Sequence, residues 1–214
     1  MTKEGFKFLI PFLAISLVLF ALWTYSSEVI ILPFAAIFLV FSLFLVFFFR
    51  DPERKAPSGE NLILSSADGK VILIKPFENL DFVGKRGTLV SVFMSVFNVH
   101  INRAPVSGKV EYFKYNPGRF FPAFKDKASS ENEQTELGLE NTRGRIILKQ
   151  IAGIIARRIV CKVKSGDKVK AGQRLGMIKF GSRVDLFLPE NVEIKVELKQ
   201  KVKAGETIIG IFKK

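Results

Sequence analysis

Three side chains in this sequence supply the groups of a nucleophilic site. Ser182 follows Gly181 in the stretch KFGSRVDLFLP. His100 lies in FMSVFNVHINRAP, and Asp68 lies in SSADGKV. A hydroxyl, an imidazole and a carboxylate are the groups with which proteins activate a serine. Each also has a structural explanation, because Asp-Gly is a common turn pair and a single histidine in an apolar strand is more often structural than catalytic. Sequence separation alone does not show that the three side chains meet.

The Gly-Ser pair is unexpected at its position. It interrupts an apolar run, from Phe180 to Leu188, that otherwise predicts a buried strand closed by Pro189. Glycine weakens a strand interior and usually marks a bulge or a close approach of another backbone. A glycine followed by a hydroxyl at this place therefore raises the question of a function, although a serine beside a glycine is unremarkable taken alone.

The remaining residues exclude several kinds of site. His100 is the only histidine and Cys161 the only cysteine, so no metal site built on histidine or thiolate is expected. A lone cysteine forms no disulfide within the chain, which suits a reducing compartment. The sequence contains no Walker loop, no G-x-G-x-x-G after a strand and no G-x-S-x-G elbow.

Two long uncharged runs near the N-terminus predict a transmembrane helical hairpin. They cover residues 8–25 and 29–49, and each is about long enough to cross a hydrocarbon core of ~30 Å. A signal peptide is the alternative, but there are two runs and no small-residue cleavage site. Lys and Arg flank the pair on its outer sides and are missing from the connection, so the positive-inside rule places both ends in the cytoplasm. We expect an anchor over residues 1–50 in the cell membrane and a cytoplasmic domain over residues 51–214.

The chain is strongly basic. It has 33 Lys and Arg against 20 Asp and Glu, a net charge of +13. For a domain tethered at a membrane, the anionic lipid surface is the nearest acidic partner. Nucleic acid is not an expected partner, because the sequence has no zinc-finger spacing, no RRM-like aromatic motif and no long basic helix.

Short runs rich in Val, Ile and Phe, separated by Gly, Pro, Asp or Asn, predict a mainly β domain after the anchor. The runs cover residues 62–64, 70–75, 88–97, 109–115, 145–150, 158–163, 174–180, 183–188, 192–198 and 206–212. The segment 150–158 fits either a strand or a short helix. Residues 119–143 interrupt the pattern with a polar, acidic stretch, which we expect to be a long loop, either a lid over a site or a solvated loop.

One motif occurs twice. KVKAG begins at residues 168 and 201, within similar segments that start at Val163 and Val196. A weaker echo links SADGKVILIK near residue 66 with PVSGKVEYFK near residue 105. The pattern resembles the hammerhead and hairpin units of barrel-sandwich folds, as in lipoyl and biotinyl carrier domains. We therefore expect two similar β units packed face to face in a barrel-sandwich, lipoyl-like domain.

Four stretches together resemble one enzyme family. FGSRVDLFLP, NVHINRAPVSG, IAGIIARRIVC and SADG resemble the short, membrane-anchored form of phosphatidylserine decarboxylase. The resemblance covers nearly all of residues 50–190, and the two-span N-terminus agrees with it. It implies a pyruvoyl-dependent lyase, made as a zymogen, that converts phosphatidylserine into phosphatidylethanolamine and CO2.

The resemblance gives the Gly-Ser pair a role. It implies that Ser182 Oγ attacks the carbonyl of Gly181, and that elimination from the resulting ester leaves a pyruvoyl group at residue 182 as the cofactor. The chain is then cut into a β subunit, residues 1–181, and an α subunit, residues 182–214, which form a heterodimer; a higher oligomer is left open. The pyruvoyl ketone forms a Schiff base with the serine head group and accepts the electrons released as CO2 leaves, a role that pyridoxal phosphate has elsewhere.

By the same resemblance, other residues have supporting roles. Asp68 and His100 are candidates to orient and deprotonate Ser182, and His100 to protonate the product carbanion. Longer relatives carry a second histidine where this chain has Arg103, so either His100 performs both tasks or another group takes one. Four arginines are candidates to bind the lipid phosphate or the substrate carboxylate, with surface charge facing the anionic leaflet as the alternative. They are Arg103, Arg157, Arg158 and Arg183.

Three other functions remain compatible with the sequence. A non-catalytic, membrane-anchored barrel-sandwich adaptor or carrier needs no Gly-Ser pair, although a carrier needs an exposed lysine, and Lys179 in MIKF is a poor match. A serine hydrolase would use the same serine, histidine and aspartate but leave the chain intact. A decarboxylase could also act on an archaeal ether lipid, archaetidylserine.

Overall fold

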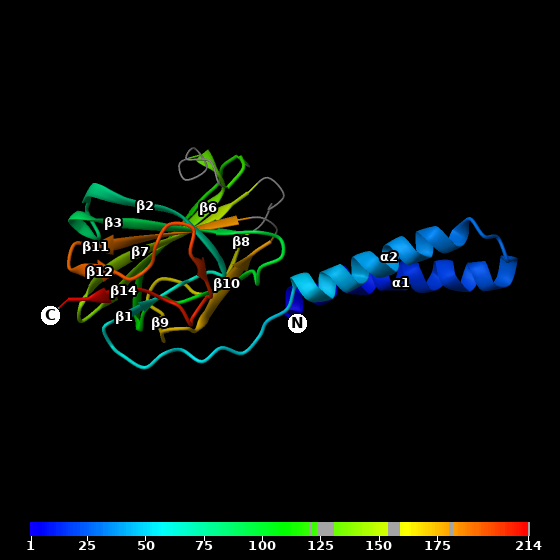
Figure 1. The fold of residues 1–214 in the computed structure, drawn as a ribbon, viewed down its shortest axis with the longest axis horizontal. Coiled ribbons are helices and arrows are strands. Elements are labelled where there is room, and N and C mark those ends of the chain that lie inside the picture. Colours follow the sequence, from blue (N-terminus) through cyan, green and yellow to red (C-terminus); the bar gives the residue numbers. More distant parts are fainter. Residues whose placement is uncertain (120, 124–130, 154–158, 180–181, 214) are drawn as a thin grey trace. The chain divides into compact units, whose positions relative to one another are not determined.

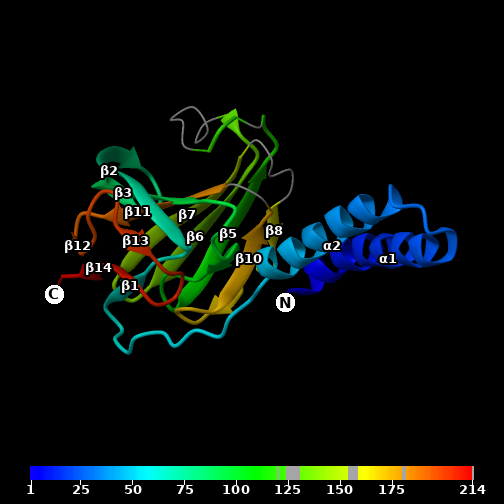
Figure 2. The ribbon, with the colours of Figure 1, turned by 45° about the vertical axis from the view of Figure 1, so that its right-hand side comes forward.

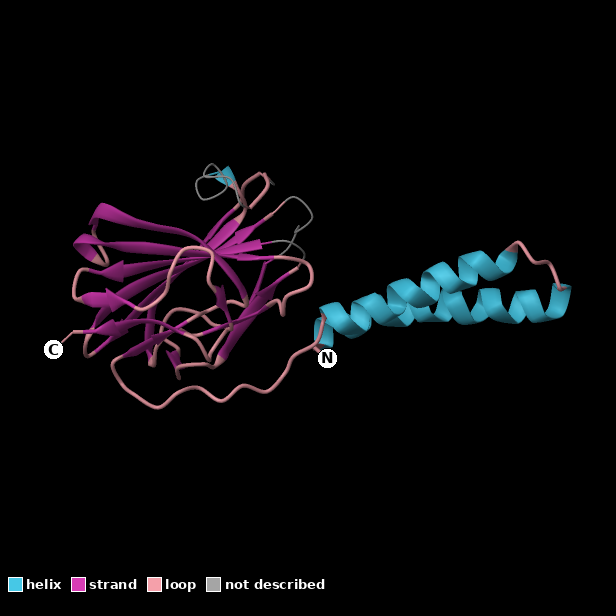
Figure 3. Cartoon of the chain, viewed as in Figure 1, coloured by secondary structure: helices cyan, strands magenta, loops and turns pink. Residues whose placement is uncertain are grey.

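The computed structural model describes residues 1–119, 121–123, 131–153, 159–179 and 182–213. The chain forms two compact units, Met1–Pro52 and Glu53–Lys214, which are considered separately. Figure 1 follows the chain by colour along the sequence. Figure 3 shows that the first unit is helical and that strands dominate the second.

The first unit is a pair of helices, α1 (Lys3–Ser26) and α2 (Ile31–Phe48). The helix α1 ends where Ser27 takes a left-handed conformation with φ of 57°. The hydroxyl of Ser16 donates a hydrogen bond of 2.9 Å to the carbonyl of Ala35, which links the two helices. Both helices are long and apolar enough to cross a membrane, as the sequence predicts.

The described residues of the second unit form three sheets (Figure 2). All pairings between the named strands are antiparallel. The largest is a curled sheet of eight strands in the order β13-β2-β3-β11-β7-β6-β5-β9. Its strands are β13 (Lys201–Val202), β2 (Gly69–Leu80), β3 (Gly84–Met94), β11 (Ser182–Pro189), β7 (Gly144–Ala152), β6 (Gln134–Asn141), β5 (Gly108–Asn116) and β9 (Lys168–Val169). The other two sheets are β1 (Leu62–Leu64), β14 (Ile208–Phe212) and β12 (Val192–Ile194), and β4 (Ile101–Arg103), β10 (Arg174–Ile178) and β8 (Ile159–Cys161). The predicted mainly β class, preceded by two apolar helices, is confirmed.

The strand β11 lies in the middle of the large sheet, paired with β3 on one side and β7 on the other. Side chains alternate along a strand, so every second residue faces the core. Val184, Leu186 and Leu188 of β11 are buried in the main apolar cluster. The segment that begins at Ser182 is therefore fixed by strand pairing and by core packing.

The repeated KVKAG motif forms the same local structure twice. Its Lys-Val pair makes a two-residue strand, β9 in one copy and β13 in the other. The glycine that follows is left-handed, with φ of 79° at Gly172 and 73° at Gly205, a conformation that favours glycine. The strand β9 pairs with the start of β5 at Gly108, and β13 pairs with the start of β2 at Gly69. The two copies thus close opposite edges of the large sheet, which accounts for both the repeat and its weaker echo.

One predicted loop proves to be partly a strand. Within residues 119–143, β6 lies in the large sheet between β5 and β7. Leu137 and Leu139 of β6 join the apolar cluster, while Glu136 forms a 2.9 Å ion pair with Lys149. This alternation of apolar and charged side chains is what a strand with one buried face requires.

Two other boundaries differ from the prediction. The strand expected over residues 88–97 begins at Gly84 and ends at Met94, because residues 95–98 form a turn. Residues 150–152 complete β7, so the strand alternative holds there, and residues 154–158 lie outside the described part of the chain.

Candidate active site

Ser182 is the first residue of the central strand β11. It pairs with Met94 at the end of β3 and with Ala152 at the end of β7. Its side chain is fully buried, and its hydroxyl lies 3.3 Å from the Met94 sulfur. Neighbouring strands therefore hold this residue from both sides. Gly181, the other half of the predicted pair, lies outside the described residues.

The Met94 sulfur is shared between Ser182 and the segment that carries His100. The side-chain amide of Asn102 lies 3.6 Å from that sulfur and 3.4 Å from the carbonyl oxygen of Ser66. Asn102 follows His100 by two residues. The histidine segment and the serine are thus brought to the same side chain, although the sequence places them far apart.

Asn102 is itself fixed by a buried polar network. Gln150 donates a 2.8 Å hydrogen bond to the side-chain oxygen of Asn102 and accepts one of 2.7 Å from the hydroxyl of Thr135. All three side chains are buried. A buried network that is satisfied in this way is rigid, because a broken link leaves a polar group without a partner. It links β4, β7 and β6 next to Ser182.

His100 follows the turn that ends β3. The side-chain oxygen of Asn98 accepts hydrogen bonds of 2.9 Å from both the backbone N–H and the hydroxyl of Ser95. The carbonyl oxygen of Asn98 lies 2.9 Å from Nδ1 of His100, which is buried. Since a carbonyl can only accept, this contact assigns the proton of the neutral ring to Nδ1 and leaves Nε2 as the basic nitrogen.

Asp68 is buried, and both of its carboxylate oxygens are engaged. Oδ1 accepts a 2.8 Å hydrogen bond from the N–H of Ala204, and Oδ2 accepts one of 2.8 Å from Arg54. The repeat supplies a counterpart, because the hydroxyl of Ser107 accepts a 2.9 Å hydrogen bond from the N–H of Ala171. The contact with Ala204 therefore belongs to the repeated architecture, whereas the contact with Arg54 is particular to Asp68.

The predicted arginines lie in different settings. Arg183 has a side chain only 2% exposed and is paired with the fully buried Asp185 through bonds of 2.6 and 3.2 Å. It also donates a 2.8 Å hydrogen bond to Ser91. Arg183 is thus committed to partners inside the sheet. Arg157 and Arg158 lie outside the described residues.

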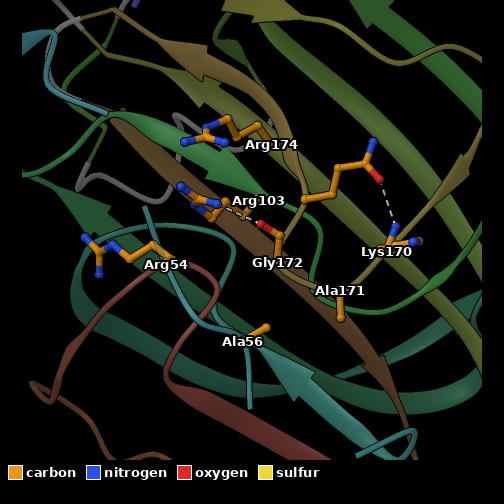
Figure 4. Close-up of a pocket in the computed structure, with 8 residues that line it drawn as sticks. Arg54, Ala56, Arg103, Lys170, Ala171, Gly172 and Arg174 are labelled. Carbon is orange, nitrogen blue, oxygen red and sulfur yellow. Dashed lines mark hydrogen bonds between the residues drawn. The ribbon is translucent and has the colours of Figure 1, made fainter. Parts of the chain in front are cut away.

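Arg103 lines a pocket of about 470 Å³ together with Lys170, Ala171 and Gly172 of the first KVKAG turn (Figure 4). It donates a 2.9 Å hydrogen bond to the carbonyl oxygen of Gly172, and Arg54 and Arg174 line the same pocket. A 2.6 Å hydrogen bond from Arg174, aided by its charge, lowers the pKa of Glu53. Successive residues of a strand face opposite ways, so Arg103 faces this pocket while Asn102 faces Met94.

Comparison with known proteins decides between the functions that the sequence leaves open. A family model described as phosphatidylserine decarboxylase matches residues 41–210. The phosphatidylserine decarboxylase proenzyme of Chlorobium phaeobacteroides (strain BS1) is 51% identical over 172 residues, with 80% of both chains covered. The protein of the same name from Citrifermentans bemidjiense is 46% identical over 214 residues, covering 98% of this chain and 95% of that relative. The chain belongs to the phosphatidylserine decarboxylase family.

Membership of the phosphatidylserine decarboxylase family confirms the resemblance that the sequence motifs indicate. The matched region contains Ser182, His100, Asp68 and Arg103. It also contains residues that sequence reasoning missed, namely the network of Asn102, Gln150 and Thr135. No clear local signal marks them, since Asn102 is followed by Arg103 and Gln150 is preceded by Lys149, so both read as ordinary polar positions.

Proposed function

We propose that this chain is the precursor of a membrane-bound phosphatidylserine decarboxylase that matures by cutting itself between Gly181 and Ser182. The observation that carries the proposal is the placement of Ser182, a buried hydroxyl at the first position of a doubly paired central strand, in a family whose relatives are named proenzymes. The names of these relatives favour phosphatidylserine over the ether-lipid alternative.

Maturation uses the hydroxyl of Ser182 as an internal nucleophile. Its oxygen bonds to the carbonyl carbon of Gly181, the peptide C–N bond breaks, and the nitrogen takes a proton, so the amide becomes an ester. Removal of the α-proton of residue 182 then expels the Gly181 carboxylate and leaves dehydroalanine. Its imine tautomer is hydrolysed by water, which releases ammonia and leaves a pyruvoyl group at the head of the α chain.

The surroundings of Ser182 fit that group. Conversion turns the hydroxymethyl side chain beside the Met94 sulfur into a methyl group and turns Cα, which loses its nitrogen, into the ketone carbon, so the volume hardly changes. The strand pairing from residue 183 onward does not depend on the cut bond. Once formed, the pyruvoyl group supplies the electron sink for decarboxylation.

The described side chains suggest how protons and charge are handled. His100, with Nδ1 held by Asn98, presents Nε2 as the base that takes the Ser182 proton and later as the donor to the product. Asp68 is proposed to support maturation. Of the two predicted arginines that the structure describes, Arg103 is the better suited to an anionic substrate group, because it lines a pocket, whereas Arg183 is committed to Asp185. Arg157 and Arg158 remain candidates on sequence grounds.

The location follows from the two apolar helices. They serve as a membrane anchor, and the distribution of Lys and Arg favours the cytoplasmic side for the catalytic unit. The α and β fragments remain associated as a heterodimer, because β11 is flanked by β3 and β7 of the other fragment.

The test is the intact mass of the purified full-length protein under denaturing conditions, beside a Ser182→Ala control. We expect fragments of residues 1–181 and 182–214, the smaller lighter by one ammonia than its unmodified sequence and blocked at its N-terminus. The control stays intact. A wild-type chain that remains whole in a membrane-mimetic environment, without release of CO2 from phosphatidylserine, would overturn the proposal and favour the hydrolase or adaptor.

A further inference from the structure

The end of the large sheet at which Ser182 lies is defined by strand register. Ser182 pairs with Met94 at the end of β3 and with Ala152 at the end of β7. At the start of β6, Gln134 pairs both with Ile151, next to Ala152, and with Asn116 at the end of β5. The segments that leave β3, β5 and β7 therefore emerge at the end of the sheet that carries the reactive serine.

Exposed aromatic side chains gather at this end. In the described part of the second unit, the large apolar side chains that are exposed are Phe97 at 68%, Phe113 at 36%, Tyr115 at 52% and Leu198 at 55%. Phe97 follows Met94 by three residues, and Phe113 and Tyr115 lie in the last part of β5. We refer to Phe97, Phe113 and Tyr115 as the aromatic rim.

Positive charge accompanies the aromatic rim. Arg119, with a side chain 76% exposed, follows β5 closely and lies 3.7 Å from Glu131. Lys114 is also exposed, but it faces the other side of β5 from Phe113 and Tyr115, over the ring of Tyr112. Aromatic rings beside basic side chains are the combination that settles at the interface of an anionic bilayer, the rings among the head groups and the cations near the lipid phosphates.

The turn that carries Phe97 is rigid and continues directly to His100. Asn98, next to Phe97, holds Ser95 through its side chain and through its backbone N–H at 3.0 Å. The carbonyl of the same Asn98 contacts Nδ1 of His100. A fixed turn thus connects an exposed aromatic ring to the buried imidazole, and the position of one constrains the position of the other.

We propose that the aromatic rim is the surface by which the catalytic unit docks on an anionic bilayer, with the ring of Phe97 inserted among the lipid head groups. The choice of a bilayer as partner follows from the two spans that tether the unit to a membrane, from the net charge of +13, and from Arg119 and Lys114 near the rim. The proposal deepens the proposed function, because docking at this end brings lipid head groups to the end of the sheet that carries Ser182.

The first experiment measures insertion without relying on activity. Full-length protein carrying Trp23→Phe, which removes the only native tryptophan, receives Phe97→Trp and is reconstituted into bilayers containing phosphatidylglycerol and brominated lipid. The matched control is Phe82→Trp. Phe82 lies in the connection between β2 and β3, which closes at the Leu80–Gly84 pair, at the end of the sheet opposite to Ser182. On transfer from detergent to bilayers, we expect bromine quenching and a blue shift of the emission at position 97. We expect neither change at position 82, where the ring is half-buried against Tyr112. Equal quenching at the two positions, or none at position 97, would overturn the proposal.

The second experiment separates docking from catalysis. Phe97→Ser should lower kcat/KM on phosphatidylserine in vesicles by about tenfold or more, roughly the effect of losing 1.4 kcal/mol of interfacial binding. It should leave turnover of a short-chain, monomeric phosphatidylserine within about twofold, and Phe97→Trp should retain activity on vesicles.

The outcomes distinguish this inference from the proposed function. An equal loss of activity of Phe97→Ser on vesicle and monomeric substrates would mean that Phe97 supports folding or the active site itself. It would overturn the docking proposal. A position-97 signal that appears only when another protein is added would assign the rim to a protein partner instead. Wild type that is inactive on both substrates, yet quenched at position 97 in the tryptophan variant, would overturn the decarboxylase proposal alone.

Discussion

The guanidinium of Arg183 donates to both carboxylate oxygens of Asp185, in a pair whose side chains are 2% and 0% exposed. The two residues lie on the same face of β11, opposite the face that packs Val184 into the core. In the proposed cleavage, Arg183 is the residue that stays bonded to residue 182. The pair therefore fixes the start of β11, next to the end that the proposal makes reactive.

Removing one partner of the Arg183–Asp185 ion pair should destabilise the fold more than replacing both partners with apolar residues. In a Ser182→Ala precursor, Asp185→Ala leaves a buried guanidinium without its partner and should cost about 3–5 kcal/mol of folding free energy. The double change Arg183→Met with Asp185→Leu removes both charges and should recover most of that loss. Thermal unfolding of the three precursors checks this, and a double variant no more stable than Asp185→Ala would contradict it.

The two contacts of Asp68, with Ala204 and with Arg54, can be tested separately. Asp68→Ser should keep the link to Ala204, as Ser107 does to Ala171, while losing the ion pair with Arg54. We expect the variant to fold but to cut itself at least about tenfold more slowly, because carboxylate support of the reacting groups contributes at the level of general acid–base catalysis. The cut fraction is followed over time by denaturing gel, with Ser107→Ala as the matched control. Cleavage at the wild-type rate would assign Asp68 a purely structural role.

The stability effects of substitutions in the buried network of Asn102, Gln150 and Thr135 should depend on one another. Gln150→Leu removes the partner of both Asn102 and Thr135 and should cost about 1–3 kcal/mol for each polar group left unsatisfied. Adding Thr135→Val should restore part of that stability, since the stranded hydroxyl is then gone. Denaturant unfolding of uncut precursors gives the coupling, and strictly additive effects would show that these side chains do not act together.

Acid should weaken the contacts that Glu136 makes with Lys149 and Tyr112. Burial alone would raise the pKa of Glu136, but hydrogen bonds from Lys149 and Tyr112 outweigh it and lower the pKa below its ordinary value of 4.5. A lowered carboxyl pKa stabilises the fold above the unfolded value, and this contribution is lost as the pH falls through the folded value. Below pH 4.5, wild type should therefore lose stability more steeply than Glu136→Gln, by about 1 kcal/mol or less because the pair is partly solvated. Melting temperatures between neutral and acidic pH measure the difference, and parallel curves would contradict it.

Much of the fold could be read from local patterns. The two spans are marked by uncharged length, and the KVKAG motif fixes a short strand and a left-handed glycine in each of its copies. The strand β6 was missed because its acidic residues and the polar stretch before it resemble a solvated loop. The alternation of Leu137 and Leu139 with charged neighbours was nevertheless present, and its meaning depends on Lys149 of the adjacent strand.

Of the candidate site, the sequence offered mainly Ser182. A glycine followed by serine inside an apolar run, together with the family resemblance, predicts Ser182 as the reactive residue, and this stays a prediction. The contacts of Asn102 with Gln150 and of Gln150 with Thr135 depend on strand pairings between residues distant in sequence, which no local pattern encodes. The burial of Arg183 likewise depends on a carboxylate two residues away that reads, in sequence, as ordinary surface charge.

If the chain is cut as proposed, the central position of β11 makes the cut a checkpoint on folding. The bond proposed to break adjoins a strand that needs β3 and β7 in place on either side, and β14, which follows β11 in the chain, forms a sheet with β1 and β12. We expect a nascent chain that still lacks β14 to stay uncut. Cleavage would then report that folding is complete, and a misfolded copy would never acquire a reactive ketone that could modify neighbouring molecules.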